Sequence, residues 1–269
     1  MQKKNNQKKP VELVRKPIVE GSWHGKDAWK LARKCFLYVI VITLIYLFSG
    51  MLFSFENVAL RALVCGTTVM MVGYYLYVCG AAQGQTDAAF GEIAYNRRAE
   101  GKNVPADEAA RSFHPLKGYF AVLVGAAPFV LFAIVFACMT ELGRYQLGVL
   151  PTWTTSLSTQ TEFADGLRYY QNQPGMGAVD VMRVIDRSMV MPFINVASLF
   201  GNEALLAVER LSPLLLLIAP LGYAFGYAGG LNLRARINTG IKEGDARKKR
   251  KERKARKQRQ RSKTPERLI

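Results

Sequence analysis

Four long apolar stretches dominate the hydrophobic pattern of this 269-residue chain, and polar segments separate them. An α-helix rises about 1.5 Å per residue, so about 20 apolar residues cross a hydrocarbon core about 30 Å thick. Each stretch reaches that length. The pattern therefore predicts an all-α integral membrane protein with four transmembrane helices, over residues 35–55, 58–80, 118–139 and 211–233.

The basic residues gather at the two ends of the chain and predict its orientation. Of the 37 Lys and Arg residues, ten lie in 1–34 and sixteen in 234–269. Lys and Arg next to a membrane span tend to stay on the cytoplasmic side. We therefore expect both termini in the cytoplasm, with a basic N-terminal segment at 1–34 that carries a Trp anchor (Trp23, Trp29) and a basic tail at 234–269.

The segments between the spans follow from this orientation. Only Glu56 and Asn57 separate the first two spans, so residues 35–80 are expected to form a transmembrane hairpin. Residues 81–117 are expected to be a cytoplasmic loop with two short amphipathic helices. The first of these helices would begin at Thr86 or Asp87.

Residues 140–210 are expected to be extracytoplasmic or interfacial. Within them, 179–189 predicts an amphipathic helix with an apolar face suited to the membrane interface. Residues 190–208 are apolar enough for a fifth span, but they contain Pro192 and a fifth crossing would place the basic tail outside. We interpret 190–208 as interfacial or partly re-entrant. The charged face of the predicted amphipathic helix carries Asp180, Arg183 and Arg187.

Glycines recur at helical spacing in the second and fourth spans. Small residues on one face let membrane helices approach closely, either within a chain or between chains. The pattern thus predicts a helix-packing face and favours a membrane-protein partner or a homo-oligomer. The glycines concerned are Gly66, Gly73, Gly80, Gly222, Gly226 and Gly230.

The net charge of +17 matters mainly through the tail, where eleven of the sixteen residues in 246–261 are Lys or Arg. This block can lie on anionic lipid headgroups, or it can contact RNA, for example in a ribosome, without sequence specificity. It has no aromatic residue for base stacking. The candidate contact residues are Arg247, Lys248, Lys249, Arg250, Lys251, Arg253, Lys254, Arg256 and Lys257.

Candidate chemistry is sparse along the chain. Arg61 is the one basic residue inside a predicted span, where it can either reach the interface or bind a counter-ion or substrate. No catalytic, phosphate-binding or metal-ligand motif is present, so we expect no enzyme activity, cofactor or metal. The acids of 140–210 show no paired spacing and are expected to be solvated surface charges: Glu141, Glu162, Asp165, Asp180 and Asp186.

In layout, Val58 to Arg261 resembles the YidC family of membrane-protein insertases, with two spans around a cytoplasmic hairpin, a third span, a basic tail and Arg61 in the membrane. The resemblance implies insertion of proteins next to a ribosome. The sequence itself favours an accessory or scaffold subunit of a membrane complex, multi-pass in the plasma membrane of a prokaryote. A small transporter or permease subunit is the other alternative.

Overall fold

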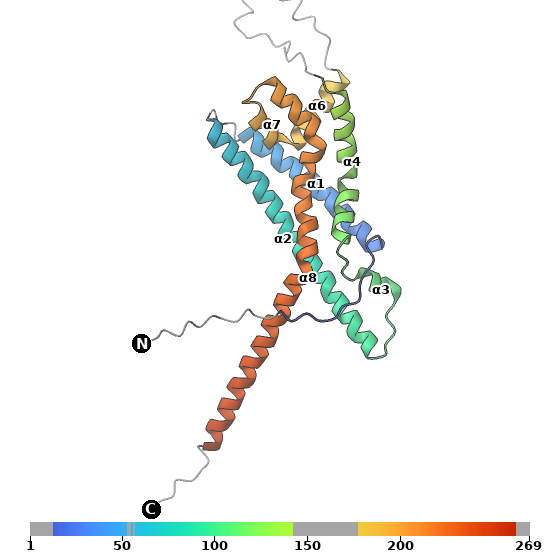
Figure 1. The fold of residues 1–269 in the computed structure, drawn as a ribbon, viewed down its shortest axis with the longest axis vertical. Coiled ribbons are helices and arrows are strands. Elements are labelled where there is room, and N and C mark those ends of the chain that lie inside the picture. The colour runs from blue at the N-terminus through green and yellow to red at the C-terminus, as the bar shows by residue number, and fades with distance from the viewer. Residues whose placement is uncertain (1–12, 53–54, 56, 142–176, 262–269) are drawn as a thin grey trace, which may run out of the picture. The chain divides into compact units, whose positions relative to one another are not determined.

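The computed structural model describes residues 13–52, 55, 57–141 and 177–261. Four long helices account for most of these residues: α1 (Lys26–Leu52), α2 (Val58–Ala99), α4 (Lys117–Met139) and α8 (Asn202–Arg261) (Figure 1). Three short helices complete the described part: α3 (Ala106–Arg111), α6 (Ala178–Met189) and α7 (Met191–Ala197). These described residues contain no β-strand.

The four long helices confirm the prediction of an all-α chain with four candidate membrane spans. Each contains a window that is long and apolar enough to cross a membrane. The predicted spans lie within α1, α2, α4 and α8, apart from residues 53–55 at the end of the first. Parts of three predicted segments lie outside the described residues: 1–12, 142–176 with Glu162 and Asp165, and 262–269.

Two helix boundaries differ from the sequence prediction. No new helix begins at Thr86 or Asp87, because α2 runs without a break through both residues to Ala99. The stretch from 81 to 99 contains no proline and has six Ala, two Gln and two Arg, which favour a continuous helix. The prediction of two short helices in 81–117 is thus wrong for the first, while α3 occupies the place of the second.

Residues 190–208 do not form one helix. Helix α7 ends at Ala197, and α8 begins at Asn202 after Gly201, whose φ of +95° is a conformation that other residues rarely adopt. This break excludes a fifth spanning helix over 190–208. It also starts α8 nine residues before the predicted fourth span, which begins at 211.

The described residues fold into two compact units, and each unit contains residues of all four long helices. Unit 1 contains the described residues of Met1–Lys30, Tyr77–Phe120 and Tyr223–Ile269. Unit 2 contains those of Leu31–Leu76 and Ala121–Gly222.

The core of unit 2 is apolar and is shared by α1, α4, α6, α7 and α8. It is formed by Val39, Ala126, Met189, Val190, Ile194 and Leu216. Glycines bring the backbones together around it: a Cβ atom on Gly125 of α4 would lie 2.5 Å from the Ala32 carbonyl oxygen of α1. A Cβ atom on Gly222 of α8 would lie equally close to the Gly73 carbonyl oxygen of α2.

Unit 1 is held together by side-chain packing and by a strap, which we define as residues 13–25. Phe113 stacks on Tyr227 of α8, with 5.4 Å between ring centroids. The strap is extended at its start and pairs through its backbone: Val19 N–H donates to the Gly91 carbonyl of α2 at 3.2 Å, and Gly21 N–H donates to the Phe113 carbonyl at 3.0 Å. This strap thereby covers part of α2.

Candidate functional site

In the described part of the chain, buried charged side chains gather at three places, and each place joins residues that are distant in sequence. We name them by their acidic residue: the Asp87 cluster and the Glu92 cluster in unit 1, and the Glu209 cluster in unit 2. A buried charge is tolerated only when other groups compensate it. Each cluster is therefore built from several helices.

The Asp87 cluster joins α2, α4 and α8. The Lys117 Nζ atom lies 3.0 Å from Asp87 Oδ2, and the same oxygen accepts a hydrogen bond from Tyr227 Oη at 2.7 Å. Gln83 donates to the other carboxylate oxygen at 2.9 Å. Lys117 also donates to the Arg111 carbonyl at 2.9 Å. Both charged groups are thus satisfied inside the protein, which indicates a structural role.

The Glu92 cluster joins α2 to the part of α8 that follows the predicted fourth span. Arg234 donates to Glu92 Oε2 through Nε at 3.0 Å and through Nη2 at 2.7 Å. The other carboxylate oxygen accepts from Asn238 Nδ2 at 2.6 Å. The amide oxygen of Asn238 is buried and has no hydrogen-bond partner.

The Glu209 cluster joins α6, α8 and the end of α4. Glu209 is fully buried; its Oε1 atom lies 2.7 Å from Arg187 Nη2 and 3.4 Å from Arg183 Nε. Its Oε2 atom accepts from Thr140 Oγ1 at 2.7 Å. The charged side chains Arg183 and Arg187 of α6 therefore face the interior of unit 2. The apolar side chains Val181, Val184 and Ile185 on the same helix are exposed.

Asp186 belongs to the same cluster and corrects the expectation of a solvated surface charge. Its side chain is fully buried; Oδ1 accepts from Ser212 Oγ at 2.8 Å, and Oδ2 has no hydrogen-bond partner. Burial raises the pKa of this carboxyl from 3.8 to about 7, and nearby Glu209 adds to the rise, although Ser212 and Arg187 oppose it. Asp186 can therefore gain or lose a proton near neutral pH.

Sequence reasoning missed most of these residues because a polar residue between apolar runs is expected to face water. One signal was present: Glu209 lies two residues before the predicted fourth span, and the predicted helix 179–189 offers two arginines as partners. Asp180 and Glu141 remain exposed, in agreement with the expectation for them.

Arg61 lies in the first turns of α2. The side chain of Asn57, just before this helix, accepts hydrogen bonds from the N–H groups of residues 59 and 60. Its Nε atom donates to the Phe55 carbonyl at 2.6 Å, and its Nη1 atom donates to Ser198 Oγ at 3.3 Å. These hydrogen bonds tie the start of α2 to Phe55 and to Ser198, which follows α7. The contacts of Arg61 are thus with the polypeptide itself.

The predicted packing glycines fall into two groups. A Cβ atom on Gly80, Gly226 or Gly230 would collide with backbone atoms of the facing helix within unit 1, and one on Gly222 would do so within unit 2. A Cβ atom on Gly66 or Gly73 would meet nothing within 4 Å. The fourth-span glycines therefore pack inside the chain, where their neighbours on α2 are Gly73, Tyr77 and Gly84.

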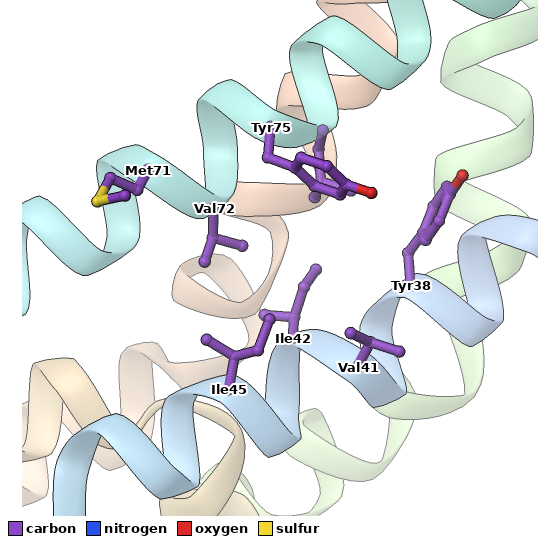
Figure 2. Close-up of a pocket in the computed structure, with 8 residues that line it drawn as sticks. Tyr38, Val41, Ile42, Ile45, Met71, Val72 and Tyr75 are labelled. Atoms are coloured by element: carbon purple, nitrogen blue, oxygen red, sulfur yellow. The ribbon is translucent and has the colours of Figure 1, made fainter. Parts of the chain in front are cut away.

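A shallow groove of about 180 Å³ lies between α1 and α2 in unit 2. Figure 2 shows Ile42 of α1 and Val72 of α2 pointing toward each other across it. Its lining is apolar apart from the hydroxyl groups of Tyr38 and Tyr75. Such a surface suits a hydrocarbon chain.

The basic tail is helical. Helix α8 continues to Arg261, and every side chain from 240 to 259 is exposed. The nine predicted contact residues, Arg247 to Lys257, therefore surround a helix that no described segment covers (Figure 1).

The described residues hold no group of three or more His, Cys, Asp or Glu side chains arranged to bind a metal ion. The site chemistry of this part of the chain is that of ion pairs, one protonatable carboxyl and a basic helix. Comparison with protein-family models, curated proteins and solved structures found no match for the chain.

Proposed function

We propose that the protein is a scaffold subunit of a membrane complex, which holds an RNA-containing partner at the membrane through the extension of α8. In this proposal the protein is a multi-pass protein of a prokaryotic plasma membrane, and both termini lie in the cytoplasm. The observation that carries the proposal is that one helix, Asn202–Arg261, includes both a candidate span and the basic residues.

Because α8 is continuous, its length sets how far the basic residues lie from the end of the span. If the span ends near residue 233, residues 247–261 extend about 20 to 40 Å beyond it along the helix axis. The field of anionic headgroups is screened over about 8 Å at physiological salt. Most of the basic extension then lies too far from the bilayer to be held by it, so a cytoplasmic partner is favoured.

The composition of the extension favours a phosphate backbone over a protein groove. A helix that binds a protein groove needs apolar side chains at i, i+3 or i+4, and i+7. From Lys242 to Arg261 the apolar side chains are only those of Ala246 and Ala255. Eleven mutually repelling cations gain most from a dense polyanion, which releases counter-ions when it is neutralised.

Binding of the full-length protein in zwitterionic nanodiscs to a single-stranded RNA tests the proposal, with poly-glutamate as an acidic polypeptide of similar charge. Substitution of Lys249, Arg250 and Arg253 by Gln should weaken RNA binding and reduce the salt slope by about 2, because each lost phosphate contact removes about 0.7. The matched control is Gln at Lys26, Arg33 and Lys34, which are also exposed and lie on α1.

RNA affinity unchanged by the tail substitutions, or equally reduced by the α1 substitutions, would contradict the proposal. Tighter binding of poly-glutamate than of RNA would assign the extension to an acidic protein instead and would also contradict it. Protease accessibility of the tail in sealed inside-out and right-side-out vesicles tests the orientation. Cleavage in right-side-out vesicles would exclude cytoplasmic termini.

A further inference from the structure

A second basic feature lies in unit 1, at a cavity of about 180 Å³ between the strap, α2 and α8. The strap contributes Arg15 and Lys16, α2 contributes Glu92, and α8 contributes Arg234 and Asn238. One molecule takes up about 30 Å³ in liquid water, so the cavity has room for roughly six water molecules. A small polar group such as a phosphate ester fits this space.

The cavity carries an excess of positive charge. Glu92 is neutralised by Arg234, which binds it through two N–H groups. Arg15 donates to Asn232 Oδ1 at 3.3 Å, which leaves its charge uncompensated. Lys16 is exposed and has no ion-pair partner among the described residues. Two cations thus remain, and they favour an anion.

Asn238 adds a second requirement. It is 4% exposed, and its Nδ2 group is fixed by donation to Glu92 Oε1 at 2.6 Å. A carboxylate accepts hydrogen bonds only, so the amide oxygen of Asn238 must point away from it. That buried oxygen has no hydrogen-bond partner among the described residues, so a hydroxyl group of a ligand or a water molecule is needed to satisfy it.

We propose that this cavity binds glycerophosphate, an anionic phosphate whose substituent carries hydroxyl groups. The phosphate lies between Arg15 and Lys16, and a hydroxyl group donates to Asn238 Oδ1. The ligand can be the headgroup of phosphatidylglycerol or a soluble glycerol phosphate. Residues 231–238 directly follow the apolar part of α8, which is where a lipid headgroup would meet the helix.

Lipid retention by the full-length protein, measured by native mass spectrometry from mixed micelles, tests the proposal. Phosphatidylmethanol is the matched probe because it has the same phosphodiester charge as phosphatidylglycerol but no headgroup hydroxyl. The wild-type protein should retain phosphatidylglycerol about tenfold better than phosphatidylmethanol, the effect of about one hydrogen bond to a buried acceptor. Phosphatidylcholine should be retained least.

Two variants separate the contribution of the two cations from that of Asn238. The double substitution Arg15→Gln and Lys16→Gln should remove retention of both anionic lipids. Asn238→Leu should erase the preference for phosphatidylglycerol and leave retention of phosphatidylmethanol unchanged. The control, Arg33→Gln with Lys34→Gln, removes the same charge from exposed positions of α1 outside the cavity and should change neither. Thermal unfolding verifies that each variant is folded.

Equal retention of the two anionic lipids by the wild-type protein would overturn the proposal without any variant. So would undiminished retention by the folded Arg15→Gln, Lys16→Gln protein. Competition by soluble glycerol phosphate assigns the site to a soluble ligand, whereas retention in its presence assigns the site to the lipid. The cavity does not involve the α8 extension, so failure of RNA binding would leave this result unaffected.

Discussion

Lys117 and Asp87 form an ion pair with 3.0 Å between Nζ and Oδ2, and their side chains are only 1% and 3% exposed. Thirty residues separate them in the sequence, and they belong to α4 and α2. Tyr227 of α8 donates to the same carboxylate oxygen. A single carboxylate therefore fixes three helices of unit 1 with respect to one another.

Loss of one member of this pair should be more harmful than loss of both charges. Lys117→Met leaves the Asp87 carboxylate buried without its cation, which should lower the free energy of unfolding by about 3 to 5 kcal/mol. The double variant Lys117→Met, Asp87→Asn should recover much of that loss. Thermal unfolding in detergent measures both. Lys102→Met, which removes an exposed pair with Glu100, should change stability by less than about 1 kcal/mol.

Gly226 of the fourth span and Gly66 of the second span should respond differently to substitution by alanine. A Cβ atom on Gly226 would collide with the Tyr77 carbonyl oxygen, so Gly226→Ala should destabilise the protein by about 1 to 3 kcal/mol. Gly66→Ala meets open space and should be neutral or slightly stabilising, because alanine favours a helix. Equal effects of the two substitutions on the unfolding temperature would contradict the packing of α8 against α2.

Stability should depend on pH through Asp186. Its pKa is raised in the folded protein from 3.8 to about 7, so between these values the folded state binds a proton that the unfolded state has lost. Stability should therefore fall as the pH rises from about 4 to 7, by roughly 4 kcal/mol in all, and should be level above that range. Asp186→Asn keeps the shape of the protonated group and should remove this component. Unfolding temperatures at pH 5 and pH 8 compare the two proteins.

Arg61 should matter for the attachment of the start of α2 to Phe55 and Ser198. Arg61→Ala loses the donors to the Phe55 carbonyl and Ser198 and should reduce stability by about 1 to 3 kcal/mol. The exposed Arg98 on the same helix provides the control, and Arg98→Ala should have little effect. A wild-type unfolding temperature for Arg61→Ala would contradict this structural role and would return Arg61 to the substrate-contact interpretation.

The sequence was sufficient to predict the four long helices, because the thickness of a bilayer sets the length of a span. It was insufficient to predict the buried charged contacts between these helices. A spanning helix needs about 20 apolar residues, so its pattern is visible without knowledge of its neighbours. Asp87 and Lys117 lie beyond the apolar runs, where a charged residue can face either water or protein. The packing of α2 against α4 and α8, which brings Tyr227 to Asp87, decides between these alternatives.

The same reasoning explains α6. Its periodicity correctly predicted a helix at 179–189, and the structure has it at Ala178–Met189. The direction of its charged face depends on Glu209, which comes from another helix. The local pattern contains no information on that partner, so Asp186 was expected in water.

The strap ties the beginning of the described chain to Thr239 of α8. The Val14 N–H group donates to Thr239 Oγ1 at 2.9 Å, across 225 positions of sequence. At a synthesis rate of about 5 to 20 residues per second, Thr239 leaves the ribosome roughly 10 to 45 s after Val14. Closure of unit 1 is therefore a late step in biogenesis, and a nascent chain stalled before Thr239 would leave unit 1 open.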